Sequence, residues 1–403
     1  ASRGYRMKNR RFLSMENEVL ISMDDGGCVE MCPSAKTMKT ARMPYRRATK
    51  CAIVFLMVVV IYAFITFLLH IGSSSSMPPF DPSPLSETQV LSDGSLVFRL
   101  AVITDLDKDS KTDDGKWKSD YRRGQLTISG DHTKVSVTWD QSDATLVSEV
   151  SSGGRAMELS DLVVFNKNLY TIDDRTGIIY KIHNLYSSSN THVVPWVILS
   201  DGPGNVTKPM KGEWMTVKDG HLYVGGLGKE WTNAQGDYIN DHPMWVKRID
   251  PYGRVKHLPW AENYKMVRRS VGIEFPGYMV HEAVQWSDVH KSWFFLPRRM
   301  SPDTYDEETD EQKGTNVLII VDDSFSSPRV VRVGTNNTQG YKGFSAFQFI
   351  PNTQDSIIVA LKSTEVNGHP NGSYITVFNI DGTVILDDQP LTSLYKFEGL
   401  AII

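Results

Sequence analysis

Cysteine is scarce in this chain, with three among 403 residues and none after Cys51. The more than 300 residues that follow Cys51 therefore contain no disulfide and depend on their own core, which a chain of that length can bury. Cys28 and Cys32 are not followed by a second Cys or His pair at zinc-site spacing, which argues against a zinc site.

Three other features are missing from the body of the chain. The net charge is −4, and no dense run of Lys and Arg alternates with aromatic residues, so nucleic acid is a poor partner. Amphipathic helical periodicity is nearly absent, whereas short apolar runs recur between turn residues. The glycine-rich stretch 225–229 lacks the spacing and the following Ser or Thr of a phosphate-binding P-loop. These observations predict an all-β body.

Only one long hydrophobic run is present, the uncharged stretch 52–69, which is just long enough to cross a bilayer as a helix. Lys and Arg are concentrated before it, so the positive-inside rule predicts a single-pass type II protein with a lumenal (Golgi or endoplasmic reticulum) or extracellular body. A cleaved signal peptide is the competing interpretation, but the preceding segment is too long for one.

The composition predicts four segments. They are a cytosolic basic tail (1–50), a transmembrane signal-anchor helix (51–71), a Ser/Pro linker (72–95) and a folded β-propeller domain (96–403). Cleavage in the linker would release a soluble form. This topology makes three N-glycosylation sequons usable, at Asn205, Asn336 and Asn371.

A two-strand pattern recurs through the body. In 158–173 and again in 213–224, a polar residue precedes an apolar strand, a tight polar turn and a second strand. Looser copies begin at His281 and Gly343, and the chain ends on a lone first strand, 397–403. Repeats of this length are typical of a β-propeller. The sequence predicts five blades, with the last strand pairing with N-terminal strands to close the ring.

An oxygen-bearing residue occupies the same phase of every copy. These residues, called the axial residues below, are Ser160, Glu213, Glu282, Ser345 and Glu398. The first strand of a propeller blade lines the central channel, so the five side chains are expected to converge. Three carboxylates and two hydroxyls suit a hard cation, and a loose ring suits Ca²⁺ better than Mg²⁺. The alternative is that they are solvated polar residues at strand starts.

Further polar clusters follow strands, where propeller loops gather on one face. Asp105 and Asp107 follow the first strand, and Asp174 and Arg175 follow the second hairpin. Lys229 and Glu230 follow the third, and Arg298 and Arg299 follow a later aromatic strand. Cations, carboxylates and a metal are the groups that phosphate chemistry needs.

Each of these clusters also has a structural interpretation. The segment 173–177 would make a tight turn with an internal ion pair, and Arg298 and Arg299 could be solvated surface charge. His242 and His281 are expected to be structural residues. The acidic run 307–311 is expected to be an exposed loop.

Several motifs, in order, resemble the calcium-activated nucleotidases, or apyrases. They are Glu158-Leu159-Ser160-Asp161-Leu162, Asp173-Asp174-Arg175-Thr176-Gly177, Pro195-Trp196-Val197-Ile198-Leu199-Ser200-Asp201-Gly202, Tyr223-Val224-Gly225-Gly226-Leu227-Gly228-Lys229-Glu230-Trp231, Trp293-Phe294-Phe295-Leu296-Pro297-Arg298-Arg299 and two stretches within 349–363. The resemblance covers about residues 99–403. It implies a five-bladed propeller with axial Ca²⁺ that hydrolyses nucleoside di- and triphosphates such as UDP, GDP, ADP and ATP.

The resemblance also implies roles for individual residues. The five axial residues match calcium ligands, and Asp105 and Asp107 match an Asp-Leu-Asp element, so Asp105, Asp107 and Asp174 are the expected catalytic residues. We expect Asp105 or Asp174 to position the attacking water and Arg175, Lys229, Glu230, Arg298 and Arg299 to bind substrate. The divergent stretch 108–117 leaves nucleotide preference open, and a homodimer is left open too. The alternative function is a calcium-stabilised lumenal binding or adhesion module without turnover.

Overall fold

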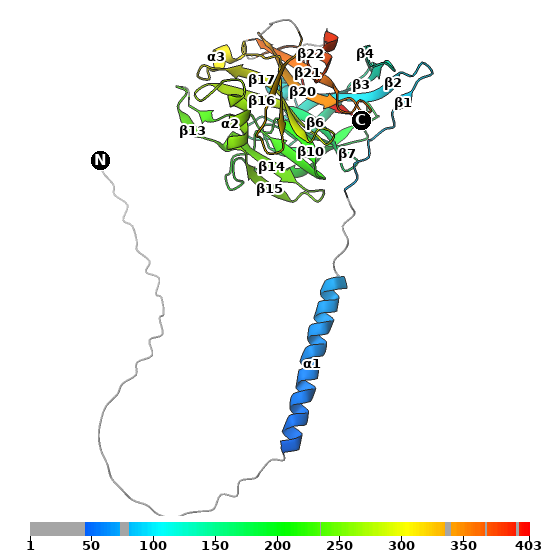
Figure 1. The fold of residues 1–403 in the computed structure, drawn as a ribbon, viewed down its shortest axis with the longest axis vertical. Coiled ribbons are helices and arrows are strands. Elements are labelled where there is room, and N and C mark those ends of the chain that lie inside the picture. The colour runs from blue at the N-terminus through cyan, green and yellow to red at the C-terminus, as the bar shows by residue number, and fades with distance from the viewer. Residues whose placement is uncertain (1–44, 73–79, 234, 335–339, 367–368, 392–394) are drawn as a thin grey trace, which may run out of the picture. The chain divides into compact units, whose positions relative to one another are not determined.

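The computed structural model describes residues 45–72, 80–233, 235–334, 340–366, 369–391 and 395–403. The chain divides into two compact units, residues 1–77 and residues 78–403. The first unit contains helix α1 (Tyr45–Gly72) (Figure 1). Within the described residues, no helix combines the length and the hydropathy that a bilayer span requires. Most of the predicted basic tail and part of the predicted linker lie outside the described residues.

The second unit contains four consecutive four-stranded antiparallel meanders. The first is β6 (Leu159–Phe165), β7 (Asn168–Asp173), β8 (Ile178–His183) and β9 (His192–Ile198). The second is β10 (Trp214–Lys218), β11 (His221–Gly225), β14 (Trp245–Ile249) and β15 (Val255–Pro259). The third is β16 (Tyr278–Ser287), β17 (Ser292–Ser301), β18 (Val317–Asp322) and β19 (Arg329–Arg332). The fourth is β20 (Lys342–Phe349), β21 (Ile357–Val366), β22 (His369–Asn379) and β23 (Val384–Pro390).

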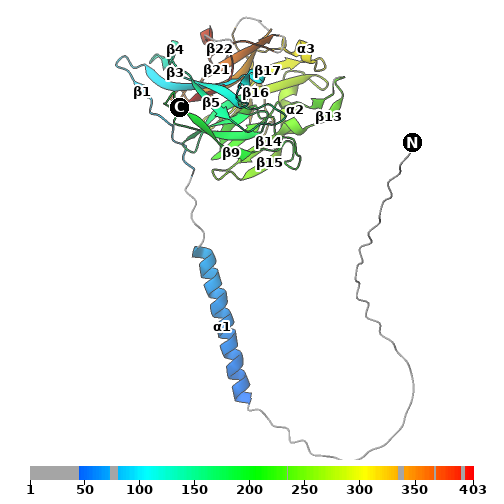
Figure 2. The ribbon, with the colours of Figure 1, turned by 180° about the vertical axis from the view of Figure 1, so that it is seen from behind.

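The fifth sheet joins the two ends of the domain. Its strands are β24 (Lys396–Ile402), β2 (Leu96–Asp105), β3 (Trp117–Ile128) and β4 (Val135–Trp139), with β1 (Gln89–Val90) beside β2 and β5 (Ala144–Ser148) beside β3. Strand β24 pairs antiparallel with β2, which places the C-terminus near β1–β3 (Figures 1 and 2). The prediction of five blades closed by the last strand is confirmed.

The first strand of each blade lies on the inside of the ring. Strands β6, β10, β16, β20 and β24 contact one another in that cyclic order, and the last returns to β6. Apolar clusters fill the spaces between neighbouring blades; one contains Trp214, Trp260 and Trp293. The turns of the first two hairpins have positive φ at Asn166 and Lys167 and at Asp219 and Gly220, which matches the twist of an antiparallel pair.

Segments between the blades carry the remaining elements. They are η1 (Asp107–Ser110), the hairpin of β12 (Trp231–Thr232) and β13 (Tyr238–Asn240), η2 (His242–Met244), α2 (Ala261–Arg269) and α3 (Glu307–Asp310). Helix α2 is amphipathic and was not predicted, because nine residues are too few to stand out against many strands. The acidic run 307–311 is partly helical, and Asp310 is buried rather than exposed.

The start of the second unit is a strap of residues 80–86 along one side of the domain. Phe80 packs against Phe165 with ring centroids 5.4 Å apart, and the backbone N–H of Asp81 donates to the side chain of Asn166. The Ser86 hydroxyl donates to the carbonyl of Ile403. These contacts lie at the β6–β7 turn and the C-terminus, whereas the polar residues described below lie at the opposite ends of the inner strands.

Candidate active site and metal site

The five axial residues all lie on the inner strands or immediately beside them. Four of the five occupy irregular positions in the strand ladder, because the pairing register shifts at Ser160, Glu282, Ser345 and Glu398. Glu213 directly precedes β10. A β-bulge turns a side chain out of the regular alternation and is common beside functional sites. All five residues are buried, and the three carboxylates line the cavity described below, whereas Ser160 and Ser345 are not among its lining residues.

Cationic side chains contact all three axial carboxylates. The Arg298 guanidinium donates from Nη1 to Glu282 and, at 2.5 Å, to Glu398 Oε1. Lys396 Nζ lies 3.4 Å from Glu398 Oε1. Lys211 Nζ lies 2.7 Å from Glu213 Oε1, an ion pair outside hydrogen-bond geometry. Burial nevertheless raises the pKa of Glu282 and of Glu398 above the ordinary value, because these cations only partly offset it.

The two axial serines differ in their partners. Ser345 Oγ donates to the backbone carbonyl of Phe397 at 3.0 Å, which leaves its lone pairs available. Ser160 Oγ is buried without any hydrogen-bond partner in the part of the chain that the structure describes. A buried hydroxyl without a partner is costly, and oxygen ligands are what Ca²⁺ prefers. The donor set of the axial residues therefore fits a calcium ion.

The charged residues that line the surrounding cavity also favour a bound cation. The cavity has a volume of about 190 Å³. Nine carboxylates line it, from Asp105, Asp107, Glu158, Asp174, Glu213, Glu282, Asp310, Glu365 and Glu398. Six cationic side chains do so, from Arg175, Lys211, Lys229, Arg298, Arg299 and Lys396. The carboxylates outnumber the cationic side chains, and a bound divalent cation would reduce this excess of negative charge.

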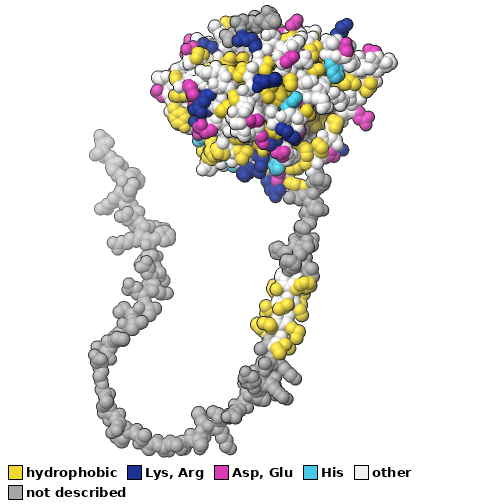
Figure 3. Space-filling model, viewed as in Figure 1, with side chains coloured by type: hydrophobic (Ala, Val, Ile, Leu, Met, Phe, Trp, Pro, Cys, Tyr) yellow, Lys and Arg dark blue, Asp and Glu magenta, His cyan; other side chains and the backbone are white. Residues whose placement is uncertain are grey.

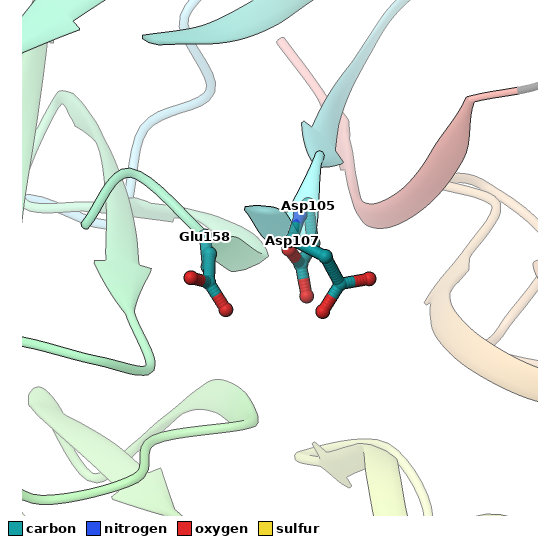
Figure 4. Close-up of side chains that lie close together, drawn as sticks. All are labelled: Asp105, Asp107 and Glu158. Atoms are coloured by element: carbon teal, nitrogen blue, oxygen red, sulfur yellow. The ribbon is translucent and has the colours of Figure 1, made fainter. Parts of the chain in front are cut away.

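A second acidic group, called the mouth cluster, consists of Asp105, Asp107 and Glu158. One ligand atom from each lies within 4.8 Å of the others. Figure 4 shows that they come from two segments, the end of β2 and the residue before β6. The mouth cluster is a second place where an acidic group could hold a cation, so two metal positions compete.

The carboxylates of the mouth cluster differ in their cationic partners. Asp105 and Asp107 both contact Lys396 Nζ, at 2.8 and 2.9 Å. Burial opposes ionisation of Asp105, but Lys396 outweighs it and holds the pKa below its ordinary value. Burial and repulsion from Asp105 raise the pKa of Asp107. Glu158 is bound by Arg155 through two bonds of 2.6 Å and by Arg175 at 2.8 Å.

The predicted substrate-binding residues do not all reach the cavity. Arg175, Lys229, Arg298 and Arg299 line it. Glu230 does not, because it forms a buried bidentate pair with Arg268 of α2 at 2.7 and 3.0 Å. Asp174 lines the cavity and pairs with Lys211, and burial raises its pKa well above the ordinary value. The ion pair within 173–177 is loose, since Arg175 Nε lies 3.8 Å from Asp174 and 2.8 Å from Glu158.

Several residues at the site were not singled out from the sequence. Lys396 and Glu365 lie at the ends of β24 and β21, and Lys211 lies in the connection before β10; all three contact the predicted carboxylates or arginines. Asp310 accepts from Arg299 at 2.5 Å and from the Tyr278 hydroxyl. Lys211 and Lys396 each precede an axial glutamate by two positions, and this repeated Lys-x-Glu spacing is a signal that could have found them.

A partly apolar wall borders the charged cavity. Leu227, Val280 and Tyr305 line it, and Trp231 packs with them. Lys229 Nζ lies 4.0 Å from the centroid of the Tyr305 ring and 5.7 Å from that of Trp231. Tyr305 also lines a second cavity of about 450 Å³, which shares Asp107, Arg175 and Arg299 with the first. Anionic and aromatic groups of one ligand could therefore be bound side by side.

The remaining predicted residues lie on the surface or in the core. Asn205 and Asn371 are exposed, and Asn336 lies outside the described residues. Both ring nitrogens of buried His281 lack partners among the described residues, and the ring packs on Tyr264 and Phe295. Charged and hydrophobic side chains are interspersed on the face of the molecule shown in Figure 3. The charged residues of the site therefore differ from those on the surface in being buried, not in residue type.

Comparison with known proteins places this arrangement in a family. The apyrase family model matches residues 106–403. The chain is 52% identical to "Apyrase apy-1" of Caenorhabditis elegans over 330 residues, 82% of this chain and 91% of that protein. It is 47% identical to "Soluble calcium-activated nucleotidase 1" of Rattus norvegicus over 80% of this chain and 78% of that protein. It is 43% identical to "Apyrase" of Cimex lectularius over 75% of this chain and 82% of that protein. With most of the propeller matched in this way, the chain belongs to the apyrase family.

Proposed function

We propose that this protein hydrolyses nucleoside di- and triphosphates to lower phosphates and inorganic phosphate in a Ca²⁺-dependent reaction. The observation that carries the proposal is the cavity in which three axial carboxylates, Glu213, Glu282 and Glu398, lie beside Arg298, Arg299 and Lys229. Such a combination of metal-binding oxygens and cations suits a phosphoanhydride. The names of two relatives, with their reference to calcium activation and to apyrase, support the same activity.

The axial residues would hold the metal ion. Bound Ca²⁺ would supply positive charge that offsets the charge of the phosphate oxygens. Arg298 and Arg299 offer planar guanidinium groups that match phosphate oxygens. Tyr305 and Trp231 offer ring faces beside Lys229, on which a nucleobase could stack.

Asp105 is the better candidate for positioning the attacking water. Its pKa lies below the ordinary value, so the carboxylate is ionised and can accept a hydrogen bond from water. Burial holds the pKa of Asp174 well above the ordinary value, and Lys211 contacts its Oδ2, which leaves Oδ1 without a hydrogen-bond partner among the described residues. The water oxygen attacks the terminal phosphorus as the bond from that phosphorus to the bridging oxygen breaks. The proton passes to Asp105, and the shortened nucleotide leaves with the bridging oxygen.

The test is phosphate release by the full chain from UDP, GDP, ADP and ATP separately. Each nucleotide is tested in calcium and then in magnesium with a calcium-selective chelator. We expect release only with calcium, and the ranking of nucleotides gives the preference. No release from any nucleotide, together with a calcium-dependent rise in melting temperature, would contradict the proposal. That outcome would favour a calcium-stabilised binding module.

We also propose that residues 51–71 anchor the chain as a type II membrane protein with the propeller in the lumen or outside the cell. The uncharged run 52–69 and the basic residues before it support this orientation. Protease treatment of sealed vesicles tests it. The propeller should survive unless detergent is added, and cleavage of the propeller in intact vesicles that retain their lumenal contents would contradict the orientation.

A further inference from the structure

Each of the three axial carboxylates is paired with a cationic side chain. Each is in direct contact with a cationic side chain that also lines the cavity: Glu213 with Lys211, Glu282 with Arg298, and Glu398 with both Arg298 and Lys396. A carboxylate lone pair that accepts an N–H bond is not available to a metal ion. Calcium and these cations therefore depend on the same carboxylates: Arg298 occupies one oxygen of Glu282 and one of Glu398, and Lys211 and Lys396 lie beside Glu213 and Glu398.

Arg298 has a second anchor that does not involve an axial residue. Its Nη1 atom contacts Glu282 and Glu398, while its Nη2 atom lies 3.1 Å from Glu365. Glu365 also contacts Arg299 at 2.6 Å and Lys396 at 3.1 Å. The attraction of Arg298 and Lys396 holds the pKa of Glu365 below its ordinary value despite burial. Glu365 thus stays ionised and forms an ion pair with Nη2, outside hydrogen-bond geometry, while Nη1 contacts the axial carboxylates.

We propose that Ca²⁺ and Arg298 compete for the Glu282 and Glu398 carboxylates, and that calcium binding turns Arg298 Nη1 from these carboxylates toward the phosphates of the substrate. Glu365 is the positioning residue that keeps the released guanidinium in the cavity. Lys211 and Lys396 are displaced from Glu213 and Glu398 in the same way. This inference rests on the proposed calcium-dependent function and assigns calcium a second effect, the release of phosphate-binding cations.

The proposal has a reciprocal consequence. If calcium releases Arg298 for the phosphates, then an occupied phosphate site draws Arg298 away from the axis and strengthens calcium binding by the same factor. Removing Arg298 removes the competitor. It should therefore strengthen calcium binding when no nucleotide is present, whereas a residue that only helped to build the calcium site would weaken it.

The experiment compares Ca²⁺ affinity by titration calorimetry in the full-length wild type and in Arg298→Met. We expect Arg298→Met to bind calcium about tenfold more tightly than the wild type, within the usual range of coupling between sites. A non-hydrolysable, methylene-bridged nucleoside diphosphate should tighten calcium binding by the wild type. The analogue should tighten calcium binding less in Arg298→Met, because this variant lacks the guanidinium through which the two sites are proposed to be coupled.

Arg299→Met is the matched control. Arg299 is the neighbouring arginine of the same cavity, and its ion pairs are with Asp310 and Glu365 rather than with an axial residue. This variant should bind the methylene-bridged analogue more weakly and bind calcium like the wild type. Arg298→Lys is the second test variant in case Arg298→Met does not fold. Lysine has a single charged nitrogen, so its calcium affinity should lie between those of the wild type and the methionine variant.

Calcium affinity in Arg298→Met and Arg298→Lys that equals or falls below that of the wild type would overturn the proposal. This readout needs no turnover. If the wild type released no phosphate from any nucleotide, the proposed hydrolase function would fail, while the calcium affinities would still decide whether arginine and calcium compete.

Discussion

Two regions of the propeller are buried to a similar degree and are built from opposite chemistry. Between the second and third blades, Trp214, Trp260 and Trp293 pack with Phe295 in an aromatic core. At one end of the axis, Glu213, Glu282 and Glu398 are just as inaccessible, although they are charged groups. Apolar burial stabilises the first region directly, whereas the second depends on each charge finding a partner of opposite sign.

The groups that stabilise the fold and the groups expected to bind the ion therefore lie in different parts of the domain. The aromatic core keeps the blades in place whatever the axis contains. The axis contains more carboxylates than cations, so it favours a state in which a cation binds there. Changes in the core should therefore alter stability without changing calcium dependence, and changes at the axis should alter the response to calcium.

The largest effect on stability is expected from Trp293→Ala. The Trp293 side chain is 1% exposed and its ring centroid lies 4.8 Å from that of Trp260. Truncation should lower the free energy of unfolding by about 3–5 kcal/mol. Denaturant unfolding in chelator and in calcium measures this. The stabilisation by calcium should be the same in the variant and in the wild type, and a variant that lost it would show that core and axis are not separate.

The largest effect on turnover is expected from Asp105→Asn. In the wild type, the backbone N–H of Asp107 donates to Asp105 Oδ1 at 2.8 Å. Asparagine keeps the size of the side chain and can still accept this bond, but it cannot take a proton from water. The kcat should fall by about 10²–10⁴-fold, the usual contribution of a general base. The melting temperature in calcium should fall as well, because the change removes a buried charge partner of Lys396, so kcat is measured well below the melting temperature of the variant. Asp113→Asn, at an exposed carboxylate of the same connection, is the control and should keep full activity.

The two axial serines offer a paired test of smaller size. Ser345→Ala removes a hydrogen bond to Phe397 and should lower the free energy of unfolding in chelator by about 1 kcal/mol. Ser160→Ala removes a buried hydroxyl that has no partner among the residues placed in the structure, and it should be neutral or stabilising in chelator.

With calcium present, both serine variants should lose affinity for the ion. The loss should be at least about tenfold, since even outer-shell partners of a metal contribute that much. Unfolding in chelator and calorimetric titration with calcium give the two numbers for each variant. Equal destabilisation of both variants in chelator would mean that Ser160 has a protein partner after all.

The smallest effect is expected at the strap, away from the site. Phe80 is partly buried against Phe165 and beside Gly220. Phe80→Ala should lower the free energy of unfolding by about 1–2 kcal/mol, below the range for a fully buried aromatic residue. The kcat and calcium affinity should not change. A change in either, measured by phosphate release and calorimetry, would show that the strap communicates with the site.

Much of the fold was predictable because it repeats. The Asp219-Gly220 turn, the alternating strands and the unpaired last strand each specify local structure by simple rules, and the ring follows from their number. The same repeat singled out the five axial residues, which are all buried, and their role as calcium ligands stays a prediction. Helix α2 was not predicted, and its Arg268 binds the Glu230 that was expected to bind substrate.

The cations of the site were harder to predict. Lys396 meets Asp105 only because β24 and β2 pair across the whole length of the domain. Glu365 meets Arg299 because β17 and β20 lie side by side in neighbouring blades, with β21 next in the sheet. Asp310 comes from a long connection in which most residues are exposed. Partnerships of this kind depend on three-dimensional arrangement and have no local pattern.

We expect the axial residues to hold the calcium ion, and calcium titration of Glu398→Gln and Glu158→Gln measures whether they do. Glu398 is axial, whereas Glu158 belongs to the mouth cluster. We predict one calcium ion per wild-type chain, a loss of affinity of at least about tenfold in Glu398→Gln and a much smaller change in Glu158→Gln. Unchanged affinity in Glu398→Gln with a strong loss in Glu158→Gln would contradict the account and place the ion at the mouth cluster.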